Sequence, residues 1–118
     1  MRDYQLADVE ARFADLIWGH EPLSSSELVK LCEVELNWKK STTYTVLKKL
    51  IQKGIFKNEH SIVSAVISKE EFYGRQSQLY VKETFGSLPK FLTAFLGEKK
   101  LSAKEVQELR EYIERYEE

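Results

Sequence analysis

The sequence predicts a mainly α-helical chain with one small β-hairpin, in the order three helices, hairpin and three helices. Apolar residues recur at helical spacing on both sides of a β-branched segment, residues 55–67. Serines followed three positions later by glutamate, together with isolated glycines, mark where the helices begin and end. With 118 residues and 42% hydrophobic content, the chain suffices for one compact domain, or one small domain with a helical extension.

Three amphipathic segments follow one another in the first half of the chain. The first, residues 8–19, ends at a glycine and carries apolar side chains at helical spacing, namely Val9, Phe13, Leu16 and Ile17. The second follows the capping box Ser24–Glu27, and its expected buried side consists of Leu28, Val29 and Cys32. The third, residues 40–53, ends before Gly54 and groups on one side Thr43, Val46, Leu47, Leu50 and Ile51.

A β-hairpin is expected after the third helix. The runs 55–57 and 62–67 are rich in β-branched residues and flank the polar residues 58–61. A capping box at Ser68–Glu71 then begins a long helix that continues to about Thr84. The hairpin therefore passes into the second half of the chain without a flexible linker.

Two shorter helices complete the chain, one within residues 87–97 and one that begins at the capping box Ser102–Glu105. Their apolar positions exceed what one small module would cover, so we expect a homodimer with two-fold symmetry. The expected dimer interface consists of Phe91, Leu92, Phe95, Val106, Leu109, Ile113 and Tyr116. We accordingly assign residues 69–118 to a helical dimerisation domain.

Charge singles out the third helix. The chain as a whole has a formal net charge of −1, so any attraction for a polyanion must be local. Between Leu36 and Asn58 there are six lysines and no Asp or Glu. The side of the third helix opposite Leu47 and Leu50 carries short hydrogen-bonding side chains and cations, namely Ser41, Thr42, Thr45, Lys48, Lys49 and Gln52.

Such a surface suits the major groove of DNA, but on this helix alone a merely solvated face is an equal alternative. The order of elements favours DNA, because a basic third helix followed by a hairpin is the order of a winged helix-turn-helix. We expect residues 1–68 to form that DNA-binding domain and to bind a double-stranded operator. The expected contacts are Lys39, Lys40, Ser41, Thr42, Tyr44, Thr45, Lys48, Lys49 and Lys57.

Several motifs together resemble the penicillinase-repressor family, which includes methicillin-resistance and copper-responsive repressors. The motifs are Leu16-Ile17-Trp18, Trp38-x3-Thr42-x2-Thr45-x-Leu47-x-Lys49-Leu50-x2-Lys53-Gly54, Phe85-Gly86-Ser87, Phe95-Leu96 and Leu101-Ser102-x2-Glu105-x2-Glu108-Leu109. The resemblance spans essentially the whole chain. It implies a bacterial, sequence-specific transcriptional repressor that binds a palindromic operator as a homodimer with interlocked C-terminal helices.

The sequence departs from this family in the recognition helix and the wing. Lys49 replaces a more usual arginine, which loses bidentate guanine recognition but keeps phosphate attraction. Ser41 and Tyr44 stand where lysine and glutamine are frequent, so a different operator preference is expected. The wing lacks the family's Gly-Arg pair, and contact between the wing and DNA stays open.

Two further departures concern the inducing signal. In antibiotic-responsive members a sensor protease cuts an Asn-Phe bond, which corresponds here to Ala94–Phe95, so we expect resistance to such proteases. The cysteine cluster of copper-responsive members is absent, so copper sensing by that route is not expected. A membrane sensor, a protease partner and no inducer at all stay open alternatives.

The sequence predicts no enzyme, cofactor or metal site. Cys32 is the lone cysteine, and His20 and His60 lie far from it, without metal-ligand spacing or a nucleophile motif. No apolar run reaches the length of a signal peptide or membrane span, so we expect a cytoplasmic protein without membrane insertion. The rival function is a winged-helix protein-interaction module that does not bind DNA.

Overall fold

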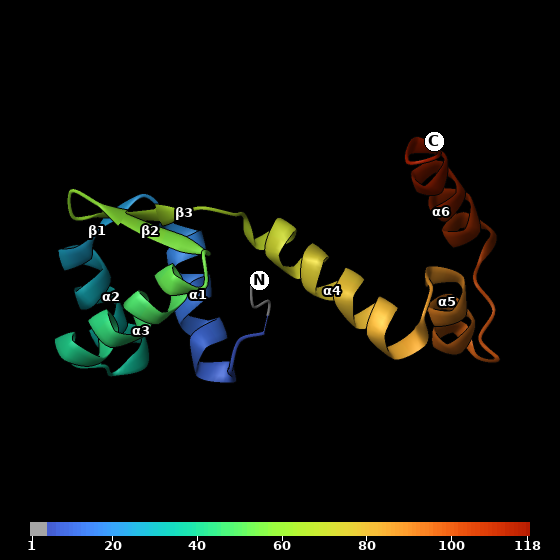
Figure 1. Cartoon of the computed structure of the whole chain (residues 1–118). Coiled ribbons are helices and arrows are strands. Elements are labelled where there is room, and N and C mark those ends of the chain that lie inside the picture. The colour runs from blue at the N-terminus through green and yellow to red at the C-terminus, as the bar shows by residue number, and fades with distance from the viewer. Residues whose placement is uncertain (1–4) are drawn as a thin grey trace. The chain divides into compact units, whose positions relative to one another are not determined.

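The computed structural model describes residues 5–118, so residues 1–4 of the expected DNA-binding domain lie outside the described part. The elements are α1 (Asp8–His20), β1 (Leu23–Ser24), α2 (Ser25–Leu36), α3 (Lys40–Gln52), β2 (Phe56–Glu59), β3 (Ile62–Ala65), α4 (Lys69–Phe85), α5 (Leu88–Leu96) and α6 (Ala103–Arg115). Figure 1 shows the predicted order of helices and hairpin, and the predicted mainly α-helical fold class is confirmed.

The chain forms two compact units, one extending to Leu79 and the other covering Tyr80–Glu118. The division between them falls inside α4, whose first turns belong to the first unit. The functional division after residue 68 stays a prediction.

The buried face of α1 differs from the predicted one. Val9 was expected to face the core, but it is 52% exposed. The buried positions are Glu10, Phe13, Ala14 and Ile17, which recur at the i, i+3, i+4 and i+7 spacing of one helix face. The acidic residue Glu10 therefore occupies the buried position that apolar periodicity assigns to its neighbour Val9.

The sheet has three antiparallel strands in the order β1-β3-β2, and β1 was not predicted because it contains only Leu23 and Ser24. Leu23 pairs with Val63, which ties the connection between α1 and α2 to the hairpin. The hairpin turn consists of His60 and Ser61 alone, both at positive φ, so it is tighter than the predicted polar segment 58–61. The wing of a winged helix is thus formed by β2, β3 and this turn.

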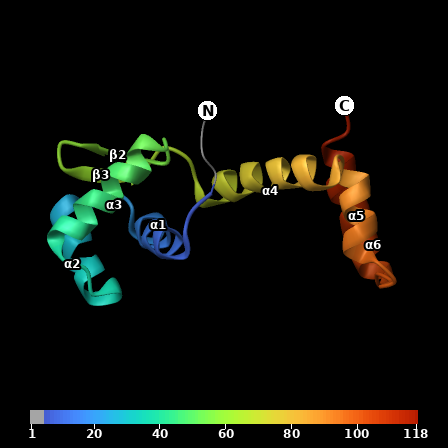
Figure 2. The same ribbon diagram turned by 60° about the horizontal axis from the view of Figure 1, so that its bottom comes forward.

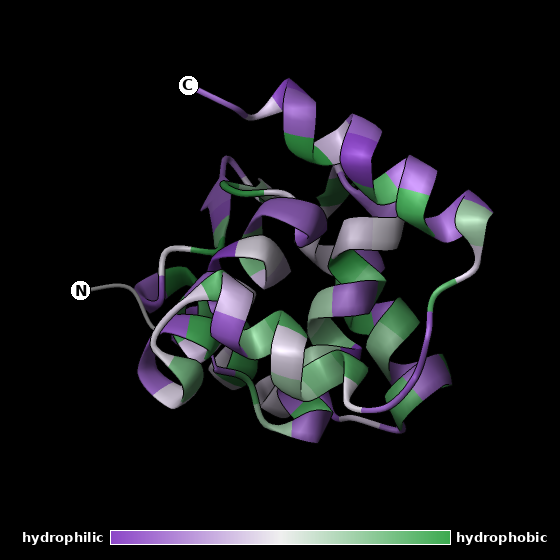
Figure 3. Cartoon of the chain, turned by 90° about the vertical axis from the view of Figure 1, so that its right-hand side faces the viewer, coloured by the Kyte–Doolittle hydropathy of each residue, from purple (hydrophilic) through white to green (hydrophobic). Residues whose placement is uncertain are grey.

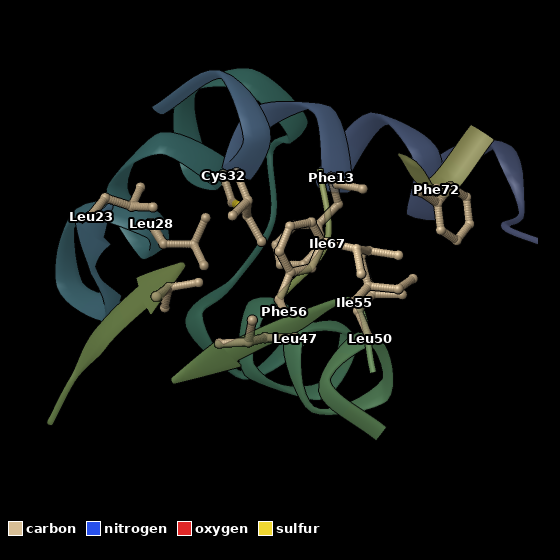
Figure 4. Packing of buried hydrophobic residues seen from close by; sticks show 13 residues of the cluster. Phe13, Leu23, Leu28, Cys32, Leu47, Leu50, Ile55, Phe56, Ile67 and Phe72 are labelled. Carbon is tan, nitrogen blue, oxygen red and sulfur yellow. The ribbon is translucent and has the colours of Figure 1, made fainter. Parts of the chain in front are cut away.

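One hydrophobic core joins α1, α2, α3, the hairpin and the beginning of α4. Figure 4 shows side chains from these elements converging, among them Phe13, Leu28, Leu47, Phe56 and Phe72. In both ribbon views α1, α2 and α3 gather beside the sheet (Figures 1 and 2). The core therefore fixes the three helices and the wing as one body.

Both tryptophans pack against this core. The indole Nε1 of Trp18 donates a hydrogen bond to the carbonyl oxygen of Ile67 at 3.1 Å. Its ring lies 5.3 Å from that of Phe56 and 5.8 Å from that of Phe72, between centroids. Trp38 stacks on Phe13 at 5.3 Å. Trp18 thereby fastens α4 to α1 and to the hairpin.

The unit Tyr80–Glu118 is packed very differently, because α5 and α6 contain no buried residue. Ring contacts at 5.3 and 5.6 Å connect Phe85 to Phe91 and Phe91 to Phe95, yet Phe95 is 70% exposed. Along α6, hydrophobic residues recur among a majority of hydrophilic ones (Figure 3). Within this unit, an apolar surface is left that its own helices do not bury.

Of the three predicted capping boxes, the one at α6 is complete. Ser102 accepts a hydrogen bond from the backbone N–H of Glu105, whose carboxylate accepts one from the backbone N–H of Ser102. At α2 and α4 the structure shows the serine half, in which Ser24 and Ser68 each accept one backbone hydrogen bond. The carboxylate of Glu71 instead accepts a hydrogen bond from the guanidinium of Arg75. The predicted starting points of all three helices are confirmed.

We predict that Phe72→Ala destabilises the winged helix although Phe72 lies in α4. The substitution removes a fully buried ring that contacts both Trp18 and Tyr73, which should cost about 3 kcal/mol or more of unfolding free energy. Urea unfolding followed by tryptophan fluorescence measures this change. Val34→Ala, at an 81% exposed position of α2, is the control and should change stability by less than about 0.5 kcal/mol. Equal effects of the two substitutions would contradict the assignment of α4's first turns to this core.

Candidate nucleic-acid interface

The core determines which side of α3 faces outward. Thr43, Leu47 and Leu50 are buried, and the hydroxyl of Thr43 donates a hydrogen bond to the carbonyl oxygen of Lys39. The opposite side is exposed at every position that the sequence places there, namely Ser41, Thr42, Thr45, Lys48, Lys49 and Gln52. The predicted orientation of α3 is therefore confirmed, whereas contact between these residues and DNA stays a prediction.

The first turn of α3 combines positive charge with the positive end of the helix dipole. Lys39 is the N-cap residue, without a side-chain cap, and no acidic residue lies in the first turn. Lys40 places its ammonium 6.0 Å from the ring centroid of Tyr44, which is half-buried. Cations here oppose the helix dipole, which costs a few tenths of a kcal/mol unless an anion approaches. The arrangement favours an anionic partner at this end of α3.

The two threonines of the outward face differ in how their hydroxyl groups are used. The hydroxyl of Thr45 donates to the carbonyl oxygen of Ser41 at 2.8 Å, so its lone pairs and methyl group are left for a partner. Thr42 makes no side-chain hydrogen bond within residues 5–118, so both its donor and its acceptors are available. A major-groove base edge presents complementary donors, acceptors and thymine methyl groups.

Lys49 has a partner that the sequence did not reveal. Its Nζ lies 2.8 Å from Oε2 of Glu10, and Nζ of Lys53 lies 3.7 Å from Oε1 of the same carboxylate. Glu10 Oε1 also accepts a hydrogen bond from the backbone N–H of Ala7. The stretch Leu36–Asn58 contains no acidic residue, but in the folded chain Glu10 of α1 lies next to two of its lysines.

The environment of Glu10 favours its charged form. The contact with Lys49, the Ala7 N–H and the charge of Lys53 hold the pKa of Glu10 below its usual value, although burial acts in the opposite direction. Oε2 is within ion-pair distance of Lys49 but makes no hydrogen bond of regular geometry. The interaction is therefore an ion pair between a nearly buried carboxylate and a largely exposed lysine.

The remaining predicted cations have different surroundings. Lys57 on β2 lies 3.6 Å from the carboxylate of Glu59, which offsets its charge beside the wing turn. Lys39 and Lys48 are exposed and form no ion pair with any residue that the structure describes. The lysines of this surface that form no ion pair within the described residues therefore lie on or next to α3 and not on the wing.

The predicted dimer residues lie on α5 and α6, apart from Tyr116, which directly follows α6. Phe91, Leu92 and Val106 are half-buried within the chain. The exposed ones are Phe95, Leu109, Ile113 and, beyond the end of α6, Tyr116. Ala94 and Phe95 are both inside α5, so the bond between them is helical and its cleavage requires local unwinding.

Two searches of residues 5–118 bear on other kinds of site. No group of three or more His, Cys, Asp or Glu side chains in this part of the chain is arranged to hold a metal ion. No helix within it is long and apolar enough to cross a membrane.

A three-helix core with a hairpin wing, followed by a helical C-terminal unit, defines a winged-helix protein with a helical appendage. The family model described as "Penicillinase repressor" matches residues 6–115, so the chain belongs to the penicillinase repressor family. The resemblance inferred from the motifs is confirmed.

Two relatives match along nearly their whole length. The chain is 25% identical to the penicillinase repressor of Bacillus licheniformis, over 95% of this chain and 91% of that one. It is 20% identical to the methicillin resistance regulatory protein MecI of Staphylococcus aureus strain Mu50, over 95% of each chain.

We predict that the Glu10 ion pair makes stability depend on pH. Because the folded-state pKa is lowered below the unfolded value of about 4.3, the pair contributes fully above that pH and its contribution falls as pH falls toward the folded-state pKa. Glu10→Gln should therefore be less stable than wild type at neutral pH, with a difference that shrinks below about pH 4. Urea unfolding of both proteins between about pH 3 and 7 tests this. A difference that is the same at all pH values would contradict it.

Proposed function

We propose that this protein is a sequence-specific transcriptional repressor that binds double-stranded DNA as a homodimer, with α3 in the major groove of each half of a palindromic operator. The observation that carries the proposal is the outward face of α3, where hydroxyl groups and lysines lie opposite a fully buried side of the helix. Hydroxyl side chains suit base edges and phosphates, and lysines suit phosphates.

Local charge supports this assignment. The net charge of −1 gives the whole molecule no attraction for DNA, so a binding surface depends on how charge is distributed. Lys39, Lys40 and Lys48 lie on or next to α3, and its first turn contains no acid. A surface that served only to bind proteins would have no need to exclude carboxylates.

The packing of the C-terminal unit supports dimerisation. A unit of about 40 residues is too small to stabilise itself by its own core without oligomerisation or a similar aid. Here α5 and α6 bury no residue, and Leu109, Ile113 and Tyr116 are exposed. A second copy would cover this surface by two-fold symmetry and would place two copies of α3 on two half-sites.

The proposal is tested by measuring binding of the purified protein to a random DNA duplex at low salt. Binding that weakens steeply with salt is expected, because phosphate contacts release counterions. Selection and sequencing of genomic fragments then identifies the operator. Failure to bind any duplex at low salt would overturn the proposal and favour the protein-interaction module.

We predict that Lys48 and the threonines contribute differently. Lys48→Ala should weaken binding to operator and random DNA alike, with a salt slope lower by about one. Thr42→Ala or Thr45→Ala should mainly lower the ratio of operator to random affinity, by about 1 kcal/mol or more for a lost base contact. Fluorescence anisotropy titrations with both duplexes provide the comparison. Equal losses on the two DNAs for the threonine variants would show that this face does not contact bases.

We predict that Leu109→Asp yields monomers. A carboxylate placed in the apolar stripe of α6 would have to be buried unpaired in the dimer, which costs several kcal/mol. Sedimentation at micromolar concentration should show a dimer for wild type and a monomer for the variant, with weaker operator binding. Val34→Asp, at an exposed apolar position of α2, is the matched control and should remain dimeric. A monomeric wild type would refute the homodimer.

A membrane sensor or a protease remains a proposed partner. The expectation that Ala94–Phe95 resists an antibiotic-sensor protease stays a prediction, which the helical state of α5 supports because a protease needs an extended chain.

A further inference from the structure

A single nearly buried carboxylate connects α1 to the outward helix of the proposed DNA surface. Glu10 is 8% exposed, and its two oxygens face Lys49 and Lys53 of α3. These lysines are one helical turn apart, so their side chains lie along one edge of α3. The structure thus divides the lysines of α3 into those that face α1 and those that do not.

We infer that Glu10 is a positioning residue of the DNA-binding surface, which holds Lys49 and Lys53 against α1 and leaves the phosphate contacts to Lys39, Lys40 and Lys48. This inference rests on the proposed function, since it states which cations of α3 reach DNA. It assigns Lys49 a different role from the phosphate contact that the sequence suggested.

The two held lysines are anchored to different degrees. The side chain of Lys53 is 15% exposed, and its Nζ also donates a hydrogen bond to the carbonyl oxygen of Gln5 at 2.9 Å. Lys49 is anchored by Glu10 at 2.8 Å, although most of its side chain is exposed. Lys48, the neighbour of Lys49, is turned about 100° around the helix and is free of such a contact in the described chain.

Glu10 opposes the transfer of Lys49 to a phosphate for two reasons. Moving the ammonium away would leave a desolvated carboxylate with less compensation, which is costly. The carboxylate also repels any phosphate that approaches this edge of α3. The consequence is a limit on sequence-independent affinity, because the number of phosphate contacts sets both its strength and its salt dependence.

A purely structural ion pair would have different consequences. Its loss would lower stability but would leave the number of phosphate contacts unchanged. If Glu10 instead holds Lys49 and Lys53 away from the phosphates, removal of its charge should add phosphate contacts. The slope of log affinity against log salt counts these contacts and is therefore the measurement that separates the two roles.

The test measures binding of Glu10→Gln and wild type to the same random duplex by fluorescence anisotropy over a series of salt concentrations. Glu10→Gln should bind more tightly at low salt, with a slope steeper by about one for each lysine that gains a phosphate. Asp15→Asn is the matched control, because it removes an acid from the same helix and frees Lys69, which belongs to α4. The slope of this control should equal that of wild type. A slope for Glu10→Gln that equals wild type, or a rise of the same size in Asp15→Asn, would overturn the inference.

A second pair of variants keeps the inference testable if Glu10→Gln folds poorly. Lys48→Gln and Lys49→Gln each remove one positive charge from neighbouring positions of α3. The inference expects the slope to fall by about one for Lys48→Gln and to stay near the wild-type value for Lys49→Gln. A reduction of the same size in both would overturn it. Absence of binding by wild type would instead refute the proposed function, so the two failures are distinguishable.

Discussion

The packing of α3 against the core is the constraint on which the rest of the surface depends. Thr43, Leu47 and Leu50 are buried, and this fixes the rotation of the helix about its own axis. Because successive residues are about 100° apart, the rotation decides at once which side chains face outward. Trp18 stabilises the same core, since its hydrogen bond to the Ile67 carbonyl and its ring contacts join α1, the hairpin and α4.

The distribution of positive charge on this surface depends on which lysines form ion pairs and not on an excess of basic residues. Acids and bases nearly balance over the chain, so free positive charge is created only where lysines lack a carboxylate neighbour. Glu10 offsets the charge of Lys49 and Glu59 offsets that of Lys57, whereas the first turn of α3 contains no acid. The surface that results is a restricted positive patch on a molecule whose formal net charge is −1.

The two units of the chain are stabilised by different means. The first buries a continuous core of large side chains from α1 to Phe72 (Figure 4). The second has α5 and α6 without a buried residue and a row of aromatic rings with one exposed end. Since apolar burial is the main favourable term in folding, the second unit draws much less stability from its own packing than the first.

The sequence by itself determined the order of the elements, their capping serines, the outward face of α3 and the family. These are set by local periodicity and by motifs in which each residue is near its partners along the chain. The tertiary structure decided what depends on long-range contacts. It added the strand β1, whose two residues are too few to show a sequence pattern. It also placed Glu10, and not Val9, on the buried face of α1. It also brought Glu10 within 2.8 Å of Lys49, a pairing that the sequence does not reveal because only folding brings α1 and α3 together.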